Sequence, residues 1–226
     1  MAKLLMLVAA GLALFATPAA GATNFIASLT TGQETAPITP SQTDGSPRPQ
    51  AFGNGTFTLN DAETALVYSL TVFNIDFTGT QTADINDNLV AAHVHVGPTA
   101  MPGSNAPVVF GFLGSPFNDN NPNDVVISPF GSGVGGTISG KWDSPEGNNT
   151  TLAAQIANLL AGLSYVNFHT VQYPGGEIRG ALAPQAVPEA NTWAMMMFGF
   201  VVLGAAVRHN RKQSPFAIGR QPHPHP

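Results

Sequence analysis

Three histidines and one glutamate of the chain are placed where they could bind a metal ion. His93 and His95 are two residues apart, and His169 comes much later, shortly before Glu177. On a β-strand, residues two apart point to the same face, with Cα atoms about 6.6 Å apart at about 3.3 Å per residue. The imidazoles of His93 and His95 can then converge on one ion. If the strand of His169 pairs with theirs or faces it, three imidazoles meet near Glu177, a ligand set that suits zinc or copper.

The same histidines also suit a structural role, and the sequence leaves both roles open. They can hydrogen-bond to one another, to backbone carbonyls or to Glu177, and so fasten neighbouring strands. Arg179 lies on the same predicted strand face as Glu177, where the two can form a bracing ion pair. Catalysis without a metal has the least support, because no Gly-x-Ser-x-Gly elbow or other nucleophile setting accompanies the histidines.

Charge and composition exclude several classes of function. Between Thr23 and Ala186 the chain has 12 acidic and three basic residues. A nucleic-acid-binding protein needs clustered lysine and arginine to neutralise phosphates, so nucleic acid is excluded as a partner. The chain has no cysteine, which rules out thiolate catalysis, cysteine-ligated zinc and stabilisation by disulfides.

Residues 1–22 predict that the chain is exported. A lysine near the start is followed by the apolar run Leu4–Ala16, and small residues close the segment. This is the pattern of a secretory signal peptide, and we expect signal peptidase to cleave between Ala22 and Thr23. The apolar run is too short to remain as a membrane-spanning anchor.

The other end of the chain predicts a second sorting signal, at residues 187–212. Val187-Pro188-Glu189 is followed by an uncharged segment, residues 192–207, which would reach about 24 Å as a helix at about 1.5 Å per residue. That length is marginal for a transmembrane helix. The segment is closed by the basic residues Arg208, Arg211 and Lys212. Basic residues stay on the cytoplasmic side, so the part of the chain before them would lie outside, in agreement with the signal peptide.

This order of features resembles the PEP-CTERM sorting signal of Gram-negative bacteria. The resemblance implies that an exosortase-type enzyme recognises the Pro188-Glu189 motif while the chain is transiently anchored in the inner membrane. The enzyme would then release the protein toward the cell surface or the extracellular matrix. Two departures concern Ala190, where the motif has its second proline, and residues 213–226, which continue as a predicted disordered tail beyond the usual end.

Residues 23–186 are expected to form one all-β domain. Short runs with β-type composition dominate it, and only Leu152–Leu160 has helical spacing, with Asn149 or Thr150 as cap and Gly162 as stop. We therefore expect an antiparallel β-sandwich or flattened barrel of about eight strands with one short helix. The expected strands are Asn24–Thr30, Gly55–Leu59, Ala65–Phe73, Leu89–Val96, Ala106–Phe112, Gly136–Trp142, Leu163–Val171 and Glu177–Leu182.

Several of these segments together resemble the CHRD domain, named after chordin. The segments that carry the resemblance are Phe25–Leu29, Gly32-Gln33-Glu34, Leu66–Leu70, Ala92–Gly97, Tyr165–Thr170 and Pro174–Gly180. The last block is the most specific. The resemblance implies an extracellular β fold and brings no established catalytic residues.

These features together predict a non-enzymatic binding or structural module of the cell surface or extracellular matrix, whose partner the sequence does not identify. The alternative is a copper- or zinc-binding protein, or a metalloenzyme similar to copper–zinc superoxide dismutase, that uses His93, His95 and His169. That enzyme class uses more metal-binding histidines than this domain has, since the other three histidines of the chain lie after residue 207.

Overall fold

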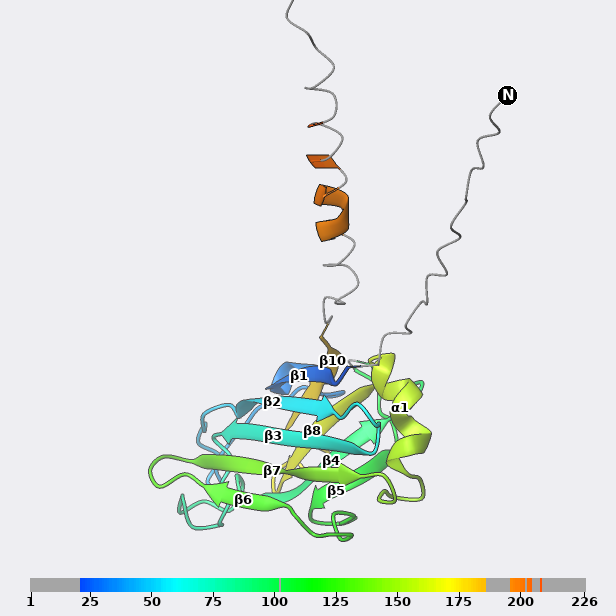
Figure 1. Ribbon diagram of the computed structural model, residues 1–226. Helices are drawn as coiled ribbons and strands as arrows, with labels where there is room; N and C mark the ends of the chain where they lie inside the picture. The colour runs from blue at the N-terminus through cyan, green and yellow to red at the C-terminus, as the bar shows by residue number, and fades with distance from the viewer. Residues whose placement is uncertain (1–20, 102, 186–195, 202, 205–207, 209–226) are drawn as a thin grey trace, which may run out of the picture. The chain divides into compact units, whose positions relative to one another are not determined.

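The computed structural model describes residues 21–101, 103–185, 196–201, 203, 204 and 208. Residues 21–185 form an all-β unit with ten strands, one short 3-10 helix and one α-helix (Figure 1). The strands are β1 Thr23–Thr30, β2 Phe52–Leu59, β3 Ala65–Phe73, β4 Leu89–Val96, β5 Val108–Leu113, β6 Val126–Pro129, β7 Gly135–Asp143, β8 Ser164–Thr170, β9 Ile178–Ala181 and β10 Ala183–Pro184. The helices are η1 Thr31–Gln33 and α1 Leu152–Leu160.

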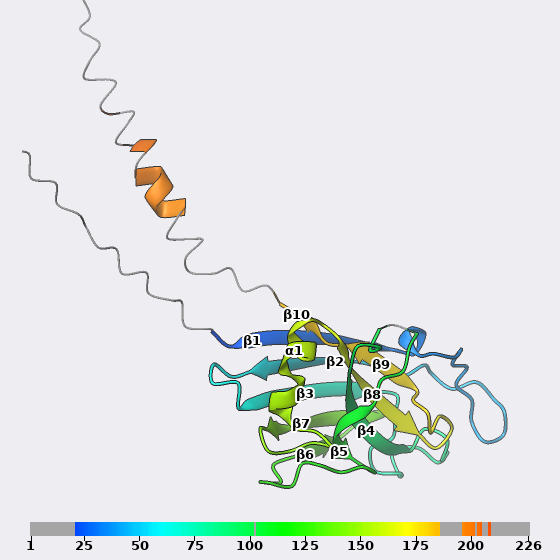
Figure 2. The ribbon, with the colours of Figure 1, turned by 90° about the vertical axis from the view of Figure 1, so that its right-hand side faces the viewer.

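The strands belong to one antiparallel sheet that curls on itself. Their order is β5-β4-β8-β9-β1-β2-β3-β7-β6, and β10 pairs with β1 beside this path. The sheet turns at β1, which pairs with β9 only through Thr30 and Arg179. In Figure 1, β4, β5 and β8 lie behind the layer formed by β2, β3 and β7, and Figure 2 gives the view from the side. The prediction of an all-β, sandwich-like fold with one short helix is confirmed, although one continuous sheet supplies both layers.

The hydrophobic core lies between the two layers of the curled sheet. Tyr68 on β3 contacts the rings of Phe110 and Phe112 on β5, with ring centroids 6.2 and 5.1 Å apart. In the order of the sheet, five strands lie between β3 and β5, so this contact joins the two layers. Alternation along β3 explains this, since Leu66, Tyr68, Leu70 and Val72 are all buried. Val67, on the opposite face, is 46% exposed. Apolar burial on this scale is the main stabilising contribution in a chain without disulfides.

The predicted elements match the observed ones closely, with two additions. The bounds of β3 and β4 are those expected, and the remaining six predicted strands are present with shifted ends. The additions are β6 and β10, which are short and carry proline. Proline cannot donate to a strand ladder, so it is tolerated in β6 because that strand forms an edge of the sheet.

Helix α1 has the bounds expected from its spacing, but its cap differs from both predicted residues. Its N-cap is Thr151, whose hydroxyl oxygen accepts a hydrogen bond from the Ala154 N–H at 3.3 Å, in place of Asn149 or Thr150. Gly162 follows the last turn with a φ of +71°, as expected for the residue that stops a helix.

Much of the two chain ends lies outside the described residues. This applies to residues 1–20 of the predicted signal peptide, to the tail at 213–226, and to most of the sorting signal at 187–212. Residues 196–201, 203, 204 and 208, in and next to the predicted transmembrane segment 192–207, are helical. Among the described residues, no helix combines the length and the apolar character needed to cross a membrane.

Because Phe110 packs against the opposite layer, we expect its replacement to lower the stability of the domain strongly. Replacing Phe110 by alanine should lower the free energy of unfolding by about 3 to 5 kcal/mol, because the residue is fully buried against the opposite layer. Replacing Val67 by alanine, on the exposed face of β3, should change it by about 0.5 kcal/mol or less. Urea unfolding followed by circular dichroism measures both. Equal losses for the two variants would contradict the layered core.

Candidate functional site

Pairing of β4 with β8 brings the three histidines together. The paired residues are Ala91 with His169, His93 with Asn167, and His95 with Tyr165. Residues opposite one another in such a pair point to the same face, so the three imidazoles share one side of the two strands. Val94 and Phe168 point to the other side, where they belong to the core. The sequence left open whether the strand of His169 pairs with that of His93 and His95 or faces it, and the structure shows that the two strands pair.

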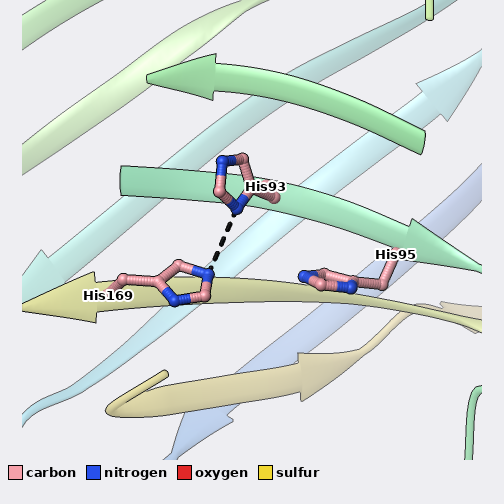
Figure 3. Close-up of side chains that lie close together, drawn as sticks. All are labelled: His93, His95 and His169. Carbon is pink, nitrogen blue, oxygen red and sulfur yellow. Dashed lines mark hydrogen bonds between the residues drawn. The ribbon is translucent and has the colours of Figure 1, made fainter. Parts of the chain in front are cut away.

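The three imidazoles form a compact and buried cluster. His93 Nδ1 lies 3.2 Å from His169 Nε2, and one ring nitrogen of each histidine lies within 4.8 Å of one from each of the others. Figure 3 shows the three rings converging on the space over β4 and β8. Only 4% of His93 and 8% of each of the other two are exposed.

Backbone carbonyls of two loops fix the orientation of two of the rings. His95 Nδ1 donates to the Ala106 carbonyl at 2.8 Å, and His169 Nδ1 donates to the Pro174 carbonyl at 2.9 Å. A carbonyl oxygen can only accept, so each of these rings carries its proton on Nδ1. In the neutral ring, Nε2 of His95 and Nε2 of His169 are therefore bare nitrogens with a free lone pair.

The hydrogen bonds within the cluster leave two ring nitrogens without a partner. His93 Nδ1–H donates to the bare Nε2 of His169, which satisfies one lone pair. Among the described residues, Nε2 of His93 and Nε2 of His95 are buried and make no hydrogen bond. A buried acceptor left in this state costs about 1 to 3 kcal/mol, so two of them together are unusual.

Burial keeps the cluster uncharged. Loss of hydration lowers the pKa of His93 and of His95 from 6.5 to about 4, and the nearby His169 lowers both. Burial also lowers the pKa of His169. All three side chains are thus neutral at pH 7, which is the form in which histidine binds a metal ion.

A stacked pair of side chains borders the cluster. The ring of His95 lies parallel to that of Tyr165, with centroids 4.5 Å apart and planes 10° apart. The guanidinium of Arg179, on β9, lies 4.2 Å from the Tyr165 ring centre, a cation–π contact. Arg179 also donates to Glu34 at 2.9 Å, and this ion pair is almost completely buried. The arrangement ties η1 and its following residues to the sheet.

Glu177 is placed away from the histidine cluster. Its carboxylate accepts two hydrogen bonds from Arg48, at 2.7 and 2.5 Å, and a third from the Thr170 hydroxyl at 2.6 Å. The described residues close enough to share a metal ion are the three histidines alone. The expected Glu177–Arg179 pair is not formed, because each residue pairs with a partner from the loop region after β1, Glu177 with Arg48 and Arg179 with Glu34.

Arg48 and Glu34 are the residues that sequence reasoning missed. They lie 129 and 145 positions from their partners, so no local pattern connects them. One signal was available, since residues 23–186 contain only two arginines. A buried carboxylate needs a cation as partner, and residues 23–186 contain only three basic side chains that could be that partner.

Two glycines explain why the segments around the cluster admit no side chain. Gly176 has a φ of +122°, and a Cβ there would lie 2.5 Å from the amide nitrogen of Asn167. Gly111, opposite His93 on β5, would place a Cβ 1.9 Å from the Pro116 carbonyl oxygen and 3.0 Å from the His93 ring. The backbone at Gly111 therefore lies close to the His93 ring, and the backbone at Gly176 lies close to Asn167, which pairs with His93 across the two strands.

Comparison with known families assigns this domain. The family description that matches is the CHRD domain, over residues 25–182. The chain belongs to the CHRD domain family. The CHRD match covers nearly all of the sheet from β1 to β9, together with the histidine cluster and both buried ion pairs. Neither the curated proteins nor the solved structures include a match to the chain.

Breaking the buried Arg48–Glu177 pair should strongly destabilise the CHRD domain. Replacing Arg48 by methionine leaves the Glu177 carboxylate buried without its cation, which costs about 3 to 5 kcal/mol. Replacing Lys141 by methionine removes two partly exposed ion pairs, with Asp124 and Asp143, and should cost less than about 1 kcal/mol. Urea unfolding at pH 7 compares the two. A double variant, R48M with E177L, should recover stability relative to R48M, and a further loss would show that the pair is not what the change disrupts.

Stability of the metal-free protein should fall as the pH is lowered from 6.5 to 4. The pKa values of His93 and His95 in the folded state, about 4, lie below the ordinary value of 6.5. The unfolded chain therefore binds more protons in this interval, and each histidine contributes at most about 1.4 kcal/mol per pH unit. Thermal unfolding in the presence of a chelator measures the slope. It should be shallower for H95Q and unchanged for H209Q, and identical slopes for all three proteins would refute the assignment.

Proposed function

We propose that the chain is an exported, non-enzymatic CHRD module that acts at the bacterial cell surface or in the extracellular matrix. There it binds a surface or matrix partner or forms part of the matrix itself. The observation that carries the proposal is the CHRD match across nearly the whole described β domain, which suggests an extracellular or structural module. The sequence features of both ends agree with export.

The way the domain uses its charged groups supports a structural role. Both arginines of residues 23–186 are buried in ion pairs that join loops to the sheet, Arg48 with Glu177 and Arg179 with Glu34. In a chain without cysteine, such pairs fix loop positions that disulfides often fix in other exported domains. These two ion pairs stabilise the fold, and none of their four charged groups is exposed for catalysis.

The outer face of β1, β2 and β3 is suited to contact with a partner of neutral, polar chemistry. The outward residues of these three strands carry no charge, and hydroxyl and amide side chains dominate among them. Its outward residues are Asn24, Ile26, Ser28, Thr30, Phe52, Asn54, Thr56, Thr58, Val67, Ser69, Thr71 and Phe73. Such a surface can hydrogen-bond to an uncharged matrix polymer without a desolvation cost for ions.

Export and sorting follow from the two predicted signals at the chain ends. Signal peptidase would cleave between Ala22 and Thr23. An exosortase-type enzyme would recognise Val187-Pro188-Glu189 at the inner membrane and release the protein to the surface. The domain between these two points would be delivered as the mature product.

Deleting residues 187–226 tests the sorting step. In a Gram-negative host with an exosortase, we expect the full chain at the cell surface or in the matrix and the truncated chain free in the medium. Fractionation followed by immunoblotting locates both, and mass spectrometry of the mature chain should find Thr23 at its N-terminus. A variant with alanine at both Pro188 and Glu189 is the matched control and should accumulate unprocessed in the inner membrane. Unchanged surface retention of the truncated chain would refute a sorting role for this segment.

A further inference from the structure

The histidine cluster is only partly satisfied by the protein itself. Its three rings supply hydrogen bonds to Ala106, to Pro174 and within the cluster, yet the buried Nε2 of His95 has no partner among the described residues. Hydrogen bonds that fasten the strands do not account for this nitrogen, because it makes none. A buried imidazole at this position therefore needs a further explanation.

Hydrogen bonds from two loops orient the rings in the way that is common for metal-binding histidines. Metal-binding histidines commonly donate one N–H to a backbone carbonyl, and this bond directs the other nitrogen at the ion. His95 and His169 have this arrangement through Ala106 and Pro174, so that each offers a bare Nε2. His93 completes the set with Nδ1, the nitrogen that faces His169 in Figure 3. In the metal-free cluster this nitrogen carries a proton, so metal binding requires the other neutral form of the His93 ring, with the proton on Nε2.

The distances within the cluster require little movement to bind one ion. With metal–nitrogen bonds of about 2.0 Å, three nitrogens around an ion in trigonal geometry are about 3.5 Å apart. His93 Nδ1 and His169 Nε2 are already 3.2 Å apart, and one ring nitrogen from each of the three histidines lies within 4.8 Å of the others. The largest of these separations therefore exceeds the trigonal distance by at most about 1.3 Å, which rotation of the side chains can close.

Ligand number and charge distinguish copper from zinc at this place. Zinc is almost always four-coordinate, and where three histidines bind it a water takes the fourth position. The described residues within reach are three buried histidines, each with 8% or less of its surface exposed, and they supply no fourth ligand. Glu177 and Glu34 are already neutralised by Arg48 and Arg179, so neither of these two carboxylates compensates a doubly charged ion. An ion of charge +1 costs less to bury than one of charge +2. Three imidazoles are a complete ligand set for Cu(I), and imidazole suits copper well.

We propose that His95 Nε2, His169 Nε2 and His93 Nδ1 bind one copper ion as Cu(I), enclosed between strands β4 and β8 and the loops that carry Ala106 and Pro174. This inference goes beyond the proposed surface or matrix role and stands independently of it. Bound copper would satisfy the orphaned lone pair of His95 and would link two strands and two loops at one point.

Metal titration of the full chain tests the proposal. The purified protein is stripped with a chelator and titrated anaerobically with Cu(I) against the chromophoric competitor bicinchoninate, and in parallel with Zn(II). We expect one Cu(I) per chain, weaker retention of Zn(II), and a shell of three nitrogen neighbours in X-ray absorption spectra. Replacing His95 or His169 by glutamine should weaken Cu(I) binding by more than the roughly 100-fold that loss of a supporting residue costs.

Histidines near the end of the chain provide the control. A variant with alanine at His209, His223 and His225 removes every histidine outside the domain and should bind Cu(I) as the unmodified chain does. Loss of copper in this variant, unchanged binding in H95Q, or preference for Zn(II) would each overturn the proposal. If H95Q does not fold, the absorption spectrum of the unmodified chain decides, since a shell other than three nitrogens contradicts the site.

Discussion

The register of β4 against β8 is the constraint on which the site and the core both depend. In this register, alternate residues of the two strands separate cleanly, with Val94 and Phe168 in the core and the histidines on the other face. A slip of one residue would reverse every side chain of the slipped strand. It would carry imidazoles into an apolar interior and remove aromatic contacts between the layers. The core therefore specifies the position of the histidines, although they contribute little to it.

The domain has few charged residues, so each buried ion pair is important for its stability. Arg48 and Arg179 reach from opposite ends of the domain sequence to partners that lie beside the same sheet, and each closes a long loop. Closing long loops is the entropic task that disulfides perform in many exported proteins. Here ion pairs with several hydrogen bonds take that task, so loss of a single cation affects the fold more than it would on a charge-rich surface.

The fold could be predicted from local sequence patterns, whereas contacts between residues far apart in the sequence could not. Alternation along β3 and the His93–His95 spacing were sufficient to place those strands and the faces of their side chains. The spacing of Leu152–Leu160 located the helix to within a residue of its cap. No local pattern shows that Glu177 bonds to Arg48, because the two approach only after the sheet has curled. The same holds for the Ala106 and Pro174 carbonyls, which orient the imidazoles from loops whose path only the folded chain defines.

The position of β1 has a consequence for the order in which the domain can assemble. This strand is made first, yet its partners on one side, β9 and β10, are made last, and the Gln185 N–H closes the ladder by donating to the Asn24 carbonyl. Throughout synthesis, one edge of β1 has no strand to pair with and is open to wrong partners. Contacts of such sequence separation form slowly. The chain can thus complete its sheet only after residue 185 is available, so a domain shortened by a few residues at this end would keep an open edge at the place where its two layers join.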